Sequence, residues 1–192
     1  MSQEKARVRM TSQQIRKLTY AALYLAIALV LPFITGQIPE ISKALSPMHI
    51  PVLLCGFMCG WPWGMAVGFI APLLRGFLFG MPVLFPSGIA MAFELAVYGA
   101  MTGYLYSVLP RKKWITYAVL IIAMIAGRLV WGLAHVVIAG FTGSEFTFAA
   151  FLAGAVTGVI PGIILHIALI PVLVIAMERA GLSLNTPRTA GR

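Results

Sequence analysis

The sequence predicts an all-α integral membrane protein, a compact bundle of six transmembrane helices with both termini in the cytoplasm. Hydrophobic residues fill 60% of the 192 positions and charged residues only 10%, against about 25% charged residues in soluble domains. Six apolar stretches follow one another, separated by glycine, proline or basic residues. The basic residues gather on one side of these stretches, and no polar stretch is long enough for a second domain.

The first two apolar stretches differ in length. Residues 15–36 provide the roughly 20 residues that a spanning helix needs. This apolar run lacks a small-residue cleavage pattern, so we expect a retained helix after a polar cytoplasmic tail at residues 1–14. Residues 48–60 rise only about 20 Å at about 1.5 Å per residue, against a bilayer core of about 30 Å. This short stretch either counts as a span or pairs with the third stretch in a re-entrant hairpin, which would leave four spans.

The remaining stretches cover residues 61–80, 86–109, 114–140 and 146–177. The last one is long enough to tilt or to contain a break at Pro161 or Pro171. We therefore place the membrane domain at residues 15–178 and a second cytoplasmic tail at 179–192.

Basic residues set the expected orientation. Eleven of the 14 lysines and arginines fall in the N-terminal segment, in the connection at residues 110–113 or near the C-terminus, which six spans place on one side. Of the other three, Lys43 lies in an outside loop and Arg75 and Arg128 lie within spans. An excess of cations marks the cytoplasmic side. The net charge of +9 therefore indicates topology and contact with the lipid bilayer, and we expect no nucleic-acid partner.

Small residues recur every four positions. Such rows let helices approach closely. They occur in the third stretch at Gly60, Gly64, Gly68, Pro72, Gly76 and Gly80, and in the sixth at Gly154, Gly158 and Gly162. Packing inside one bundle explains most of them. The pair Ala22 and Ala26 in the first stretch is the best candidate for contact with a protein partner.

Ionisable and aromatic residues inside the spans are candidate ligand contacts. At about 1.5 Å per residue, Arg75 lies about 7 Å from the outer end of its stretch and Glu94 about 12 Å deep. Arg128, Trp131 and His135 share one helical face. The predicted ligand-binding residues, which would line one outward-facing pocket, are Arg75, Glu94, Tyr98, Arg128, Trp131, His135, His166, His49 and Phe85.

The charges in the spans favour an anionic ligand group. Glu94 pairs with either Arg128 or Arg75, so one arginine is left over. The alternative is that an ion pair only holds helices together. For His166, packing and ligand contact are equally supported.

The sequence lacks the residue patterns that metal binding, proteolysis and ATP hydrolysis need. Cys55 and Cys59 stand without further metal ligands, and we interpret them as packing thiols. HExxH and P-loop motifs are missing, and Glu94 has no neighbouring glutamate. We predict no metal site, no cofactor and no enzymatic activity.

Three stretches carry a resemblance to a known family. They are YAALYLAIALVLPF, the run from Leu45 to Gly99, and AGRLVWG, within a similarity over residues 19–177. In these the chain resembles the substrate-binding S components of energy-coupling factor (ECF) vitamin transporters, in the branch often linked to pantothenate or similar vitamins.

The resemblance implies a subunit that binds a water-soluble vitamin or precursor from outside, beneath the loop between the first two helices. It implies docking through Ala22 and Ala26 on a membrane T protein driven by two cytoplasmic ATPases, in the plasma membrane of a bacterium or archaeon. Two hypotheses from other classes remain. One is a stand-alone proton-coupled transporter using Glu94 or a histidine, and the other is a membrane assembly protein without cargo.

Overall fold

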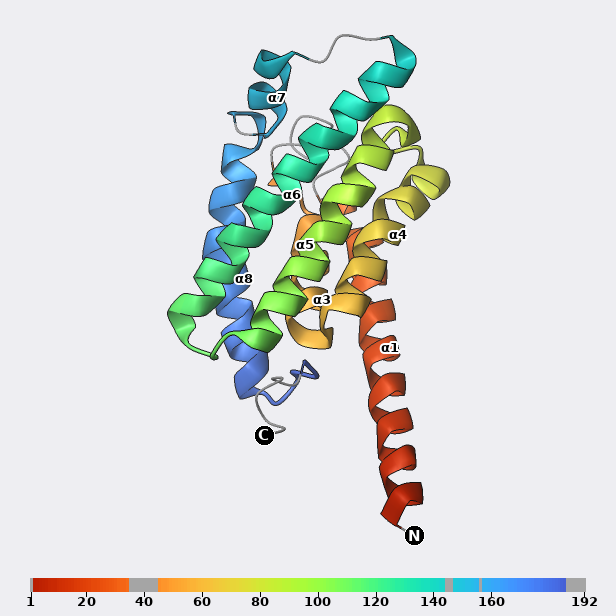
Figure 1. The fold of residues 1–192 in the computed structure, drawn as a ribbon, viewed down its shortest axis with the longest axis vertical. Helices are drawn as coiled ribbons and strands as arrows, with labels where there is room; N and C mark the ends of the chain where they lie inside the picture. The colour runs from red at the N-terminus through yellow and green to blue at the C-terminus, as the bar shows by residue number, and fades with distance from the viewer. Residues whose placement is uncertain (1, 35–44, 144–146, 156, 186–192) are drawn as a thin grey trace.

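The computed structural model describes residues 2–34, 45–143, 147–155 and 157–185, and every regular element in these ranges is helical (Figure 1). In chain order the elements are α1 (Ser2–Ile34), α3 (His49–Cys59), α4 (Trp61–Phe79), η1 (Leu84–Gly88), α5 (Ile89–Val108), α6 (Lys113–Thr142), α7 (Phe148–Ala155), η2 (Thr157–Val159) and α8 (Ile160–Arg179). From α1 to α6 the long helices run alternately up and down, and α7 and α8 run in one direction (Figure 1). The start of α1 and the end of α8 lie at the same end of the bundle (Figure 1). We call this the terminal end.

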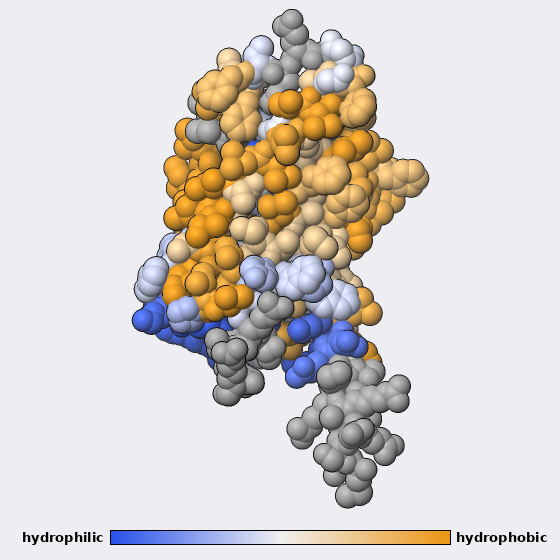
Figure 2. All heavy atoms as spheres, in the orientation of Figure 1, coloured by the Kyte–Doolittle hydropathy of each residue, from blue (hydrophilic) through white to orange (hydrophobic). Residues whose placement is uncertain are grey.

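Five described helical segments are long and apolar enough to cross a bilayer. They are Ser12–Ile34, Trp61–Phe79, Leu84–Val108, Lys113–Thr142 and Ile160–Arg179. The polar residues at the chain start continue the first of these helices, because α1 begins at Ser2. Figure 2 shows an apolar surface over the body of the bundle and hydrophilic residues gathered at the terminal end.

The second predicted stretch forms α3, a short helix at the centre of the bundle. Its 11 residues rise about 16 Å at about 1.5 Å per residue. All of them are buried, and α3 contacts α1, α4, α5 and α8. A helix that is hydrophobic all round needs such an environment. Cys55 and Cys59 lie in it as free, buried thiols.

The sixth predicted stretch is divided. The helix α7 ends at Ala155, and α8 begins at Ile160 after the short η2 turn. Pro161 stands in the first turn of α8, where a missing backbone N–H costs nothing, whereas Pro171 lies inside α8 without ending it. The predicted break is confirmed at the first of the two prolines.

Glycines bring α4 and α5 into backbone contact. A Cβ placed on Gly99 would lie 2.1 Å from the Gly64 carbonyl oxygen, and one on Gly68 would lie 2.2 Å from that of Leu95. On Gly103 it would lie 2.2 Å from the Trp61 backbone nitrogen. The predicted packing role of the third-stretch row is confirmed for Gly64 and Gly68, whereas a Cβ on Gly80 would meet nothing within 4 Å. The sixth-stretch row is divided among α7, η2 and α8.

The segment after α8 turns back across the terminal end. The Leu184 N–H donates to the Met58 carbonyl at 2.8 Å, and Asn185 Nδ2 donates to the Gly103 carbonyl at 3.1 Å. Arg111 donates to the Asn185 carbonyl and pairs with Glu178 at 3.3 Å. These contacts tie the segment to α3, α5 and α8.

Candidate functional site

A cavity of about 410 Å³ lies between the helix ends that face away from the termini. Its walls come from the end of α1, the start of α3, α4, the α4–α5 connection, α5, α6, α7 and η2. The short α3 explains its position, because α3 begins only at His49 and leaves the space beyond its first turn to side chains of the longer helices.

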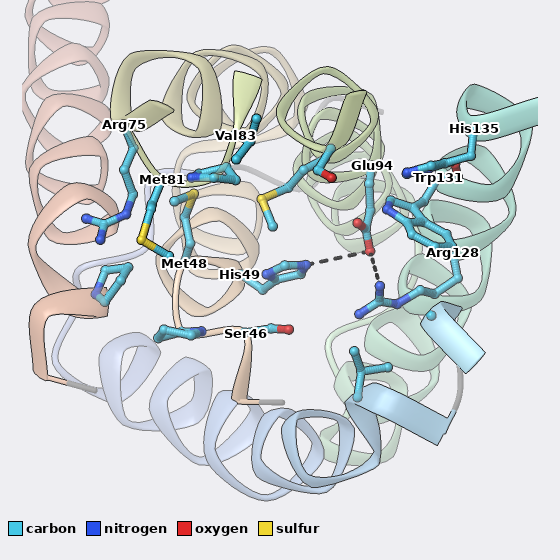
Figure 3. A pocket seen from close by; sticks show the side chains of 17 residues that line it. Ser46, Met48, His49, Arg75, Met81, Val83, Glu94, Arg128, Trp131 and His135 are labelled. Atoms are coloured by element: carbon cyan, nitrogen blue, oxygen red, sulfur yellow. Dashed lines mark hydrogen bonds and ion pairs between the residues drawn. The ribbon is translucent and has the colours of Figure 1, made fainter. Parts of the chain in front are cut away.

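Glu94 is the centre of a buried charge cluster at one side of this cavity (Figure 3). Its side chain is 1% exposed, and Oε1 lies 3.0 Å from Arg128 Nη1 and 3.6 Å from His49 Nε2. A carboxylate buried this deeply needs opposite charge or hydrogen-bond donors. Glu94 on α5 therefore connects the middle of α6 to the first residue of α3.

Arg75 lines the cavity from α4, apart from this cluster (Figure 3). It is 3% exposed, and Nη1 donates a hydrogen bond to the Leu29 carbonyl of α1. Its guanidinium lies 4.9 Å from the ring centre of Phe33 and 5.4 Å from that of Phe79. Among the described residues no carboxylate lies within ion-pair distance of Arg75, so Arg75 is the arginine that Glu94 leaves over.

Trp131 and His135 extend the wall along α6. With Arg128 they occupy the face that their spacing predicts, and all three line the cavity. The ring centres of Trp131 and His135 are 4.2 Å apart, and His135 Nδ1 lies 3.0 Å from the Trp131 carbonyl oxygen. Trp131 also covers Gly154 of α7, where a Cβ would lie 2.5 Å from the indole.

A sequence model of the substrate-specific component of ECF transporters matches residues 16–176. The chain belongs to this family. It is therefore a substrate-specific transporter component and a multi-pass membrane protein. Comparisons with curated proteins and with solved structures find no significant match.

Six of the nine predicted ligand-binding residues line the cavity of this S component. They are Arg75, Glu94, Arg128, Trp131, His135 and His49. The structure thus brings together residues from four helices that lie up to 86 positions apart in the sequence.

Tyr98 and His166 lie behind the cavity wall instead of in it. Their ring centres are 5.4 Å and 5.8 Å from that of His49, and they are 1% and 2% exposed. Gly127 of α6 allows this packing, since a Cβ there would lie 2.1 Å from the Tyr98 ring. Both rings pack against His49 from outside the cavity lining.

Phe85 is also absent from the cavity lining. It is 53% exposed and has extended backbone angles inside η1, while Val83 and Ser87 on either side line the cavity. The predicted closing loop over residues 36–49 falls partly outside the described residues, and its last residues, Ser46 to His49, form part of the wall.

Sequence reasoning missed the methionines Met48, Met81 and Met91, which also line the cavity. Met91 stands three positions before Glu94, so helical spacing was a usable signal for it. Met48 and Met81 lie outside the regular helices, where no periodicity indicates direction. Thioether side chains adapt to irregular ligand shapes.

Proposed function

We propose that this S component captures a water-soluble vitamin or precursor with a carboxylate, such as a pantothenate-like molecule, in the 410 Å³ cavity. The observation that carries the proposal is the set of polar side chains that line one cavity of an apolar bundle, among them two arginines but only one glutamate. Pockets of a few hundred Å³ with few placed polar groups are typical of small-molecule sites.

Orientation follows from the charges. The terminal end carries the basic residues of the α5–α6 connection and of the end of α8, so we place it in the cytoplasm. The cavity then faces the outside of the plasma membrane of a bacterial or archaeal cell. We infer six passes, with α3 as the short one, because the start of α1 and the end of α8 lie at the same end of the bundle.

Direct ligand contact is proposed for the six cavity-lining residues. Tyr98 and His166 are assigned a supporting role, because they touch His49 from the side that faces away from the cavity. Phe85 has no assigned contact.

Binding is tested on the purified protein. Mass spectrometry of the co-purified small molecules should identify a carboxylate-bearing compound. Arg128→Ala should lower affinity for that compound about ten- to a hundredfold, because one charge-assisted contact is lost. Arg179→Ala, at an exposed arginine of the terminal end, is the control and should leave affinity unchanged. Equal affinity of the Arg128 variant and the wild type would show that the ligand does not bind in this cavity.

Docking on a T protein with two ATPases is proposed for the outer face of α1. Ala22 and Ala26 are exposed on it, whereas Ala21, Tyr24 and Ala28 of the same helix are buried in the bundle. Exposed small residues at this spacing let another helix approach closely.

Tryptophan substitutions test this face. Ala22→Trp and Ala26→Trp should abolish co-purification of the T protein and uptake, because a large side chain separates the helices. Leu133→Trp places the same side chain on an exposed position of α6 and should have no effect. Retention of partners and uptake in both alanine variants would refute the docking face.

A further inference from the structure

The two arginines of the cavity stand in different electrostatic surroundings. Arg128 lies 3.0 Å from a carboxylate oxygen, so its charge is already offset before any ligand arrives. Among the described residues the partners of Arg75 are a backbone carbonyl and two aromatic rings, and these leave its net charge in place. An anionic ligand group therefore gains more from Arg75 than from Arg128.

Arg75 also keeps donors for such a group. A guanidinium has five N–H groups, and one nitrogen of Arg75 serves the Leu29 carbonyl. The Phe33 and Phe79 rings contact the guanidinium and hold it in place beneath the end of α1. A planar fork that is fixed in advance binds a carboxylate at a lower entropic cost than a free one.

The Glu94 cluster suits a neutral polar group. Arg128 Nε and His49 Nδ1 are buried without a hydrogen-bond partner among the described residues. A buried polar atom without a hydrogen bond costs free energy, and a ligand hydroxyl or amide that bonds to these two atoms would remove that cost. A second carboxylate there would meet the negative charge of Glu94.

The side chains between the two sites are mostly apolar. Figure 3 shows Met48 and Met81 between Arg75 and His49, and Met91 also lines the cavity. This leaves polar recognition to the two opposite sides and surrounds the middle of a ligand with thioethers.

We propose that the cavity selects an elongated molecule with one anionic group, which Arg75 binds, and a neutral hydroxyl or amide at the other end, which the Glu94–Arg128–His49 cluster binds. This inference rests on the proposed substrate-binding function and adds the polarity of the substrate to it. Arg75 is the residue that distinguishes an acid from its uncharged analogue.

Matched probe pairs test the assignment: pantothenate with panthenol, nicotinate with nicotinamide, and biotin with its primary amide. Affinity of the detergent-solubilised protein is measured by calorimetry for each member, together with the charge of any co-purified compound. The wild type should prefer the acid in at least one pair, or should co-purify with an acid. Arg75→Gln should lower affinity for that acid about ten- to a hundredfold. It should change affinity for the neutral analogue at most about threefold, an energy below one neutral hydrogen bond.

Two further variants keep the test decisive. Arg75→Lys retains the charge and should retain the preference for the acid, which separates a loss of charge from a loss of folding. The double variant Glu94→Gln with Arg128→Gln keeps the cluster neutral and should weaken the acid and the neutral analogue to the same extent.

The outcomes separate the inference from the function beneath it. A wild type that prefers the neutral analogue, or an acid preference that survives Arg75→Gln and disappears in the double variant, overturns the Arg75 assignment and leaves substrate binding intact. A wild type that binds no probe and co-purifies with no small molecule overturns both.

Discussion

At the terminal end the helices α3, α4 and α5 meet backbone to backbone, whereas at the opposite end the same helices surround a cavity. Gly64 and Gly99 show the first arrangement, since neither has room for a Cβ. Glu94 lies only five positions from Gly99 on α5 and belongs to the cavity wall. One helix thus contributes its tightest contact and its most costly buried charge within about one and a half turns.

The two Arg–Glu pairs show the same difference. The Arg111–Glu178 pair at the terminal end has side chains 29% and 23% exposed, and such a pair contributes about 0–1 kcal/mol. The Arg128–Glu94 pair has side chains 16% and 1% exposed, where desolvation opposes the attraction. The packed end therefore provides stability, and the cavity end carries polar groups that stability alone does not explain.

The largest expected effect comes from breaking the buried pair on one side only. Arg128→Met should reduce the free energy of unfolding by about 3–5 kcal/mol, because Glu94 stays buried without its main partner. The double variant Arg128→Met with Glu94→Leu should be as stable as the wild type or more stable by about 1–4 kcal/mol. Unfolding in detergent, followed by fluorescence, measures both.

The control for this comparison is Glu178→Leu, which breaks the exposed pair and should cost about 0–1 kcal/mol. The double variant should also fail to bind the ligand although it is stable. If the double variant is less stable than the single variant, the buried pair supports the fold and the contrast between the two ends is lost.

A second prediction concerns the helix contact at the packed end. Gly99→Ala should lower the free energy of unfolding by about 1–3 kcal/mol, because the new methyl group meets the Gly64 backbone and not a movable side chain. Gly140→Ala is the matched control on α6, where a Cβ meets nothing within 4 Å. Thermal unfolding of both variants decides the point, and equal melting temperatures would count against backbone contact.

Much of the fold could be predicted from the sequence, because a membrane requires long apolar helices that satisfy their own backbone groups. The glycine row of the third stretch was readable from the spacing of its small residues, and the break before Pro161 from the proline itself. The burial of α3 on all sides could not be predicted from the sequence. A stretch of this length fits a short span and a re-entrant hairpin equally well, and only its contacts with four helices place it at the centre.

The candidate site could be predicted where its residues stand on regular helices. Arg128, Trp131 and His135 share a face by spacing alone, and the structure keeps them together. Spacing could not show which arginine pairs with Glu94, because that depends on how three helices cross. Spacing also predicted that Tyr98 lines the cavity. Tyr98 stands one turn after Glu94 on α5, and its ring packs against His49 behind the cavity wall.

The smallest expected effect lies in the segment that covers the terminal end. Asn185→Ala removes the buried hydrogen bond to the Gly103 carbonyl and should lower the free energy of unfolding by about 0.5–1.5 kcal/mol. Ser183→Ala is its control, since the buried Ser183 hydroxyl has no hydrogen-bond partner among the described residues and its loss should cost nothing. Ligand affinity should stay the same in both variants, because the cavity lies at the other end of α5. A drop in affinity with Asn185→Ala would show that the two ends are coupled and that closure of the terminal end helps to shape the cavity.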